Sequence, residues 1–267
     1  MVDLALADTG ATMRLVTLLF PFLCAHPALS ADMTAREITA YLFRSPAGTK
    51  PDLSHKDLSG LDLSDLDFKK ATLDGANLYG SDLSRANLSA TSLRGARLDR
   101  ATLIDADFTE ADLTGASILR PNIFADMEAF RPSNHLSFAK TRMANAHLNG
   151  TFDGVNFTGA DLTAALFGPR DPREEVLITP MMSLIGATFN NAILVQVDFS
   201  GNDLRHARFI GADLSRANVR DTRLDGADFT DATLSAADFT GATLRDTNFK
   251  KAKALERAIG LITQPRP

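Results

Sequence analysis

A large apolar residue returns at every fifth position through the C-terminal half of the chain. An α-helix repeats its apolar positions about every 3.6 residues and a β-strand about every 2, so a period of five fits neither element. A short period kept over many copies is typical of a repeat fold, in which each unit buries its apolar side by stacking on its neighbours. The series runs through Leu184, Phe189, Leu194, Phe199, Leu204, Phe209, Leu214, Val219, Leu224, Phe229, Leu234, Phe239, Leu244 and Phe249.

The type of apolar residue also repeats, with a period of twenty. Phenylalanine stacks on phenylalanine and leucine on leucine at this spacing, as in-register coils of four five-residue sides require. The pattern therefore predicts an all-β solenoid with four pentapeptides in each coil. The core positions that carry this prediction are Leu184, Phe189, Leu204, Phe209, Leu224, Phe229, Leu244 and Phe249.

The repeat divides the chain into runs and interruptions. Three runs are predicted, over residues 51–123, 138–167 and 184–249, and they are separated by predicted loops at residues 124–137 and 168–183. Within the second run, Phe152 follows Leu148 by only four positions. This one-residue deletion tightens a corner, and Gly150 and Gly154 supply permissive backbone nearby.

A small residue usually lies two positions before the large one, with Asp or Asn between them. In this respect the chain resembles the pentapeptide-repeat family, whose motif is A(D/N)LXX, over most of residues 51–254. The resemblance implies a right-handed, four-sided β-helix with the Leu or Phe and the small residue inside. Units that match the motif are Ala76-Asn77-Leu78, Ala86-Asn87-Leu88, Ala111-Asp112-Leu113, Ala160-Asp161-Leu162 and Ala212-Asp213-Leu214.

The first thirty residues have the features of a secretory signal. Met13 and Arg14 precede an apolar run over residues 15–23, and small residues follow at Ala28, Ser30 and Ala31. This order predicts a signal peptide at residues 1–31, removed on export to the periplasm, with Met13 as the true start. The run is too short to span a bilayer. A second interpretation is an apolar segment that caps the solenoid.

Both ends of a solenoid need covering, because an open coil exposes its core and unpaired backbone. Residues 32–50 are predicted to form a capping helix over 34–43 and a connector. Thr34 and Glu37 have the spacing of a capping box. At the other end, residues 250–267 are predicted to form a second helical cap through Leu255, Ala258 and Ile259. A homodimer through this C-terminal cap is a second interpretation.

The net charge is mild, at −5. The single cysteine excludes a disulfide within the monomer. Outward charges alternate in sign at a spacing of twenty, as a solvated ladder does. Arg100 and Arg120 are the exception, because they stack with like charge. They either meet an anionic partner or are screened by Asp99 or Glu110.

No pattern of catalytic or metal-binding residues emerges. No histidine has a second one at a helical spacing, the many Asp residues follow from the repeat, and no glycine-rich phosphate loop is present. We therefore expect no enzyme activity, no cofactor, no metal, no small-molecule substrate and no direct binding of nucleic acid.

The second interruption is the strongest candidate for a binding site. It is stiff and charged at its start and apolar at its end, and loops on rigid scaffolds commonly bind partners. A second interpretation is that its apolar part folds back onto the coil. The candidate protein-binding residues are Arg170, Asp171, Arg173, Glu174, Glu175, Val176, Leu177 and Ile178.

Two functions are weighed on this basis. The first is a non-enzymatic, periplasmic scaffold that binds a protein of unknown identity. The second follows from the resemblance, since some pentapeptide-repeat proteins imitate duplex DNA, bind DNA gyrase and protect it from quinolones. A mimic of DNA needs a continuous anionic face, and the mild charge and the predicted export both argue against it.

Overall fold

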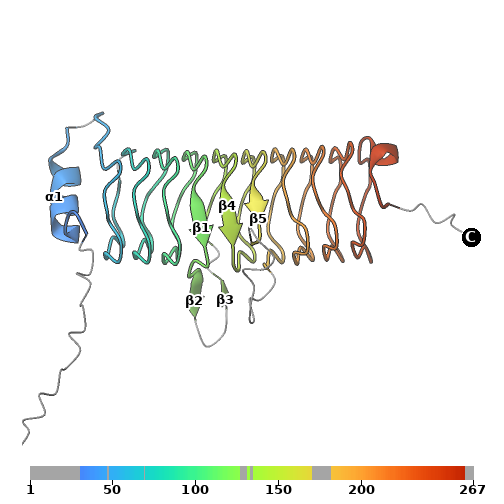
Figure 1. Ribbon diagram of the computed structural model, residues 1–267, viewed down its shortest axis with the longest axis horizontal. Helices are drawn as coiled ribbons and strands as arrows, with labels where there is room; N and C mark the ends of the chain where they lie inside the picture. Colours follow the sequence, from blue (N-terminus) through green and yellow to red (C-terminus); the bar gives the residue numbers. More distant parts are fainter. Residues whose placement is uncertain are drawn as a thin grey trace, which may run out of the picture. The chain divides into compact units, whose positions relative to one another are not determined.

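The computed structural model describes residues 31–46, 48–68, 70–126, 131–132, 135–169 and 182–261. The predicted signal peptide therefore lies outside the described residues, apart from Ala31. Regular elements are few and short, and Figure 1 shows them among the coils. They are α1 (Ala35–Arg44), β1 (Ser117–Leu119), β2 (Phe124–Asp126), β3 (Arg131–Pro132), β4 (His147–Asn149), β5 (Leu166–Phe167) and η2 (Leu255–Arg257).

The chain winds into stacked coils that are joined by parallel backbone bridges. Figure 1 shows the coils stacked side by side. Successive coils repeat every twenty residues, and each pentapeptide contributes one bridge, so that four rows of bridges run along the stack. We call these rows A to D by their first members, which are Asp52↔Thr72, Asp57↔Asn77, Asp62↔Asp82 and Asp67↔Asn87. The core residue after each bridge donates its amide to the next coil, as Leu53 does to the carbonyl of Thr72 at 2.7 Å. The predicted solenoid is thus present.

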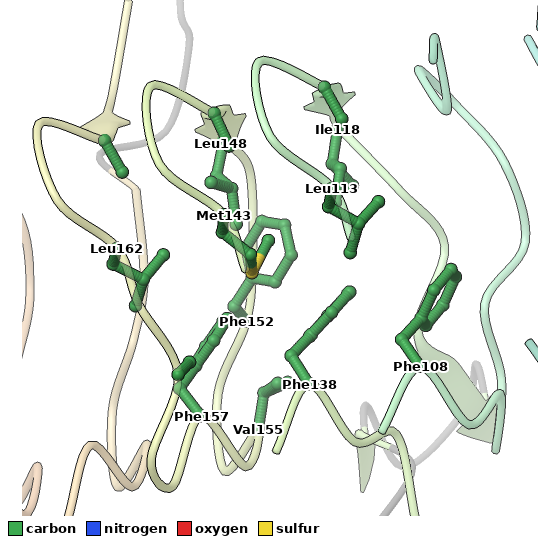
Figure 2. Packing of buried hydrophobic residues seen from close by; sticks show 14 of the residues in the cluster. Phe108, Leu113, Ile118, Phe138, Met143, Leu148, Phe152, Val155, Phe157 and Leu162 are labelled. Carbon is green, nitrogen blue, oxygen red and sulfur yellow. The ribbon is translucent and has the colours of Figure 1, made fainter. Parts of the chain in front are cut away.

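The large apolar residues and the small ones two positions earlier fill the inside of the coils. Leu184, Phe189, Leu204, Phe209, Leu224 and Phe229 are at most 1% exposed, whereas Leu244 and Phe249 of the last coil are partly buried. Phenyl rings stack along row D with centroids 4.6–5.4 Å apart, and Figure 2 shows the part of this stack near Phe108, Phe138 and Phe157. The stack continues through both interruptions, so the core residues on either side of them stay in register.

The polar residue that precedes each core position holds the following turn. Asp82 is representative, because its Oδ1 accepts hydrogen bonds from the Ser84 amide at 2.9 Å and the Ser84 hydroxyl at 2.6 Å. Local bonds of this kind favour turns. The turn then closes on a residue with positive φ, such as Arg85 at 57°. The frequent Asp and Asn residues therefore have a structural role in the corners.

Helix α1 covers the first coil. Its N-cap Thr34 accepts a bond from the Glu37 amide at 3.2 Å, and the Glu37 carboxylate accepts one from the Thr34 amide at 2.8 Å, which is the predicted capping box. Ile38 and Leu42 are buried against the first core residues. Asp32 also donates its amide to the Asp57 carbonyl at 2.7 Å, which covers part of the open backbone.

The predicted C-terminal helix is wrong for residues 250–261. The chain continues the coil instead, because Lys253 forms a bridge with Thr233 and Ile259 forms one with Asp238. Between these bridges lies only the short 3-10 turn η2. The exposed backbone of the preceding coil offers bridging partners that an isolated helix would leave unpaired, so tertiary pairing overrides the helical spacing of the apolar residues. Residues 262–267 lie outside the described part.

The interruptions change the spacing of the bridges while the stack continues. Spacing rises to thirty at Asp107↔Ser137, falls to nineteen at Ser137↔Asn156 and rises to thirty-two at Thr151↔Ser183. The first interruption contains the antiparallel pair of β2 and β3, whereas β1, β4 and β5 form a parallel sheet within row B. No helix in the described ranges is long and apolar enough to cross a membrane.

Candidate protein-binding surface

The two interruptions leave the coils at opposite ends of the row C side. The hairpin of β2 and β3 follows Ile123, which ends one row C side, and the second interruption precedes Ser183, which begins another two coils later. Only the coil that contains Thr151 lies between them in row C. The predicted binding residues themselves lie outside the described residues; they are Arg170, Asp171, Arg173, Glu174, Glu175, Val176, Leu177 and Ile178.

The coil holds the start of the second interruption in place by three hydrogen bonds. The Gly168 amide donates to the Leu148 carbonyl at 2.9 Å, and the Gly168 carbonyl lies 2.6 Å from Nε2 of the buried His147. The side-chain amide of Asn202 donates to the Phe167 carbonyl at 2.8 Å. Asn202 is 3% exposed and takes the inward position that alanine usually fills, so it satisfies a carbonyl that the interrupted corner would otherwise leave buried and unpaired.

The end of the second interruption is also anchored. Met182 is 3% exposed, and its carbonyl accepts the amide of Asp203 at 3.0 Å. The Ser183 hydroxyl donates to Asp153 at 2.5 Å, and Asp153 also accepts the amide of Ile185 at 2.8 Å. Met182, the last residue of the apolar stretch, thus packs into the coil, and both ends of the loop leave from fixed positions. The rest of the apolar stretch, residues 176–181, lies outside the described residues.

A bridge is missing from row C between the two interruptions. Bridges join Thr102 to Asn122 and Thr151 to Ser183, but within the described ranges none joins Asn122 to Thr151. Rows A, B and D still link the same two coils, for example at Asp112↔Arg142. The deletion after Leu148 shortens the corner, and β2 turns away to pair with β3. In row C, the described backbone is therefore not bridged between Asn122 and Thr151, at the place that lies between the two interruptions.

Gly150 makes this tight corner possible, and its replacement by alanine should destabilise the protein by about 1–2 kcal/mol. Its φ is 134°, and an added Cβ would lie 3.1 Å from Arg120 Cα and 3.3 Å from Pro121 Cδ. Gly154→Ala is the matched control, because its φ of 69° resembles that of Ala90 at 53° and nothing lies within 4 Å of its added Cβ. Urea unfolding followed by circular dichroism measures both. Equal losses would contradict the role assigned to Gly150.

Stacked charges pair along the coils as the sequence predicts. Arg85 binds Asp65 of the preceding coil through two hydrogen bonds of 2.6 Å, with both side chains largely exposed. Pairs of this kind contribute roughly 0.2–1 kcal/mol. Asp112 differs, because its carboxylate is buried and bound by Arg94 at 2.7 Å and Arg142 at 3.0 Å. Burial raises the pKa of Asp112, but hydrogen bonds from Thr114 and the two arginines outweigh it and lower the pKa to about 2.

The histidines are dispersed over the described coils. His55 and His206 lie at corners with positive φ, His135 contacts Asp105 at 3.2 Å and His147 anchors Gly168. In the part of the chain that the structure describes, no three His, Cys, Asp or Glu side chains gather as metal ligands would. The expectation that the protein is not an enzyme and holds no metal stays a prediction.

Comparison with known proteins bears directly on the repeat. The family model for pentapeptide repeats (8 copies) matches residues 52–85 and 81–118, and the model for the pentapeptide repeat region matches residues 182–258. Together these matches cover more than half of the chain. No curated protein sequence matches it.

Solved structures of other repeat proteins are also similar. HetL of the cyanobacterium Nostoc sp. strain PCC 7120 is a pentapeptide repeat protein involved in regulating heterocyst differentiation; it is 25% identical, with a TM-score of 0.45, over 86% of this chain and 98% of its own. QnrB1, a plasmid-mediated fluoroquinolone resistance protein, is 16% identical, with a TM-score of 0.46, over 68% of this chain and 74% of its own. Both TM-scores are below 0.5, so the assignment rests on the sequence motifs. The chain belongs to the pentapeptide repeat family.

Proposed function

We propose that this protein is a non-enzymatic scaffold that binds another protein in the periplasm. The observation that carries the proposal is the placement of the two interruptions at opposite ends of the row C side. The coils fix where both interruptions begin and end, through Gly168, Met182 and the strands β2 and β3. A loop held at both ends on a rigid support loses less conformational freedom on binding, which favours affinity.

Export rests on the order of charged, apolar and small residues before Ala31. The first described residues are compatible with cleavage after Ser30 or Ala31. Asp32 already contacts the first coil, with its carboxylate accepting the amide of Asp57 at 2.8 Å, and the capping box begins at Thr34. A chain that starts at Ala31 or Asp32 would keep these contacts of Asp32 and Thr34.

We further infer that the coil is right-handed and four-sided, as crossovers between parallel strands usually are right-handed and the bridges fall into four rows. Its C-terminal end is the place where a second copy would bind. Ile259 is 52% exposed there, and Leu244 and Phe249 are only partly buried. A homodimer through this end would cover the apolar residues of the last coil.

Charge along the rows favours the scaffold over a mimic of DNA. A mimic would present one carboxylate after another along a face. Row C places only Asp62 and Asp82 in succession before Thr102. In the first part of row B, only Asp57 has a carboxylate. The bridge residues that follow it are Asn77, Arg97, Ser117, His147 and Leu166. The charges along the rows therefore argue against binding to DNA gyrase.

The location is tested by the mass of the N-terminus of the protein recovered from cell fractions. We expect a periplasmic form that begins at Ala31 or Asp32. An intact cytoplasmic form would overturn the export proposal and make a gyrase protection assay the next experiment.

Loop function is tested by a deletion that restores the regular repeat. Removing residues 170–181 brings Phe167 and Leu184 to the normal spacing of five, and Pro169→Gly lets the new corner adopt positive φ. This variant should fold but should lose the protein partner that chemical cross-linking recovers with the natural chain. Deletion of residues 126–135 restores the spacing between Ile123 and Phe138 in the same way and tests the contribution of the first interruption separately. An unfolded first variant would show that the loop is part of the core, and a folded variant that keeps its partner would overturn the proposal.

A further inference from the structure

The arginine edge, which we define as Arg100 and Arg120, is a pair of like charges at one corner of neighbouring coils. Both residues close the turn between rows B and C, with φ of 58° and 51°, and both are exposed. Consecutive coils are about 4.8 Å apart. At the corresponding corner between rows C and D, by contrast, Asp65 stacks with Arg85 and neutralises it.

The two carboxylates nearest in sequence do not screen this pair. Asp99 is turned inward, where its Oδ2 lies 2.7 Å from Arg97 Nε and its Oδ1 accepts the Ser117 hydroxyl at 2.5 Å. Glu110 belongs to another corner and lies 3.6 Å from Lys140. Over the described ranges, no carboxylate approaches either guanidinium of the arginine edge within 4.0 Å. The pair is thus a local positive site on a protein with a net negative charge.

The backbone beneath the arginine edge is fixed. The Arg100 amide donates to the Leu119 carbonyl at 2.8 Å, and the Arg120 amide donates to the Asn149 carbonyl at 2.5 Å. Both amides are therefore used within the stack and are not available to a bound anion. What the edge presents to a ligand is two guanidinium groups, each able to bind a carboxylate through two parallel hydrogen bonds.

Apolar surface lies beside the two charges. The half-buried Leu119 immediately precedes Arg120, and the ring of Tyr79 lies one coil before Arg100 with the Arg97 guanidinium 4.5 Å from its centroid. A small inorganic anion would use only the guanidinium groups. An extended peptide would place carboxylates on the arginines and rest its aliphatic groups on Leu119, because the Arg97 guanidinium already covers one face of the Tyr79 ring.

We propose that the arginine edge binds an acidic peptide segment, with one carboxylate on Arg100 and another on Arg120. This inference rests on the proposed scaffold function and names the chemistry of the partner. Successive carboxylates on one face of an extended segment lie about 7 Å apart, which two flexible arginines one coil apart can reach. The segment would run along the stack, towards the corner where Gly150 marks the missing bridge in row C.

The test measures binding of a fluorescent peptide with alternating Glu and Ser to the full chain at low ionic strength. Arg100→Ala with Arg120→Ala should weaken binding about 2- to 30-fold, as expected for two exposed ion pairs. The control is Arg208→Ala with Arg216→Ala, which removes the same charge from two exposed arginines elsewhere in the coils. It should change affinity by less than about twofold. Equal loss in both variants would show nonspecific attraction and overturn the proposal.

Two further measurements separate the remaining outcomes. The variant Arg100→Glu with Arg120→Glu should lose the Glu peptide and gain a Lys peptide of the same length. If inorganic phosphate displaces the labelled peptide as effectively as unlabelled peptide does, the edge is a simple anion site and the proposal is overturned. If the alanine variant loses the peptide but keeps the cross-linked partner, the scaffold function stands and its assignment to this edge fails. If the alanine variant loses both the peptide and the cross-linked partner, the proposal is supported.

Discussion

Replacing Phe209 with alanine should lower the free energy of unfolding by about 3–5 kcal/mol. Phe209 is 1% exposed and lies between Phe189 and Phe229, with ring centroids 5.1 Å and 4.6 Å away and planes within 4° of parallel. The backbone bridges hold the neighbouring coils at a fixed spacing, so they cannot collapse into the space that the ring leaves. A cavity then adds to the lost burial, and urea unfolding measures the sum.

The control for this prediction lies in the last coil. Phe249 is partly buried and stacks on a single ring in its row, that of Phe229 at 5.2 Å. Its replacement by alanine should cost about half as much or less, since water already reaches this end and fewer contacts are lost. In a repeat protein each coil contacts only its neighbours, which makes position along the stack decisive. Equal losses at Phe209 and Phe249 would contradict this account.

The core could be predicted from the sequence because each pentapeptide contributes one inward residue. Once the period of five is established, the identity of residues at a spacing of twenty predicts which side chains stack, as with Phe189, Phe209 and Phe229. Local geometry and tertiary packing agree here, which makes such patterns reliable. The capping box at Thr34 and Glu37 was predictable for the same reason, because both of its hydrogen bonds are local.

The C-terminal end was not predictable in this way. Leu255, Ala258 and Ile259 have helical spacing, but their conformation depends on the open backbone of the preceding coil, which pairs with Lys253 and Ile259. Sequence spacing describes the segment alone and contains no information on that competing edge. The helix prediction failed for this reason.

The candidate surface was predictable only in part. Extra residues between core positions locate the interruptions, and the spacings of thirty and thirty-two give their lengths. The missing bridge between Asn122 and Thr151 depends on how the deletion and the hairpin meet in space, which no local pattern records. The sequence also leaves open whether Asp99 screens Arg100, because the direction of this carboxylate is set by Ser117 and Leu119 of the next coil.

Lowering the pH should reduce the free energy of unfolding by roughly 2 kcal/mol through protonation of Asp112 alone. Burial raises the pKa of this carboxyl, but hydrogen bonds from Thr114, Arg94 and Arg142 lower it from 3.8 to about 2 in the folded protein. A pKa that is lower in the folded state means that the ionised form stabilises the fold. The contribution is fully present well above pH 3.8 and is lost as the pH falls towards about 2.

Asp112→Asn isolates this effect from the other carboxylates of the corners. Asparagine keeps an oxygen that can accept the Thr114 amide but removes the charge that Arg94 and Arg142 neutralise. The variant should therefore be less stable than the natural protein at pH 5 by roughly 2 kcal/mol, and the two should converge near pH 2. Urea unfolding at pH 5, 3 and 2 provides the comparison. Parallel losses of stability in the two proteins would mean that the Asp112 carboxylate is not held by its two arginines, because only a charged, paired group makes the difference between them depend on pH.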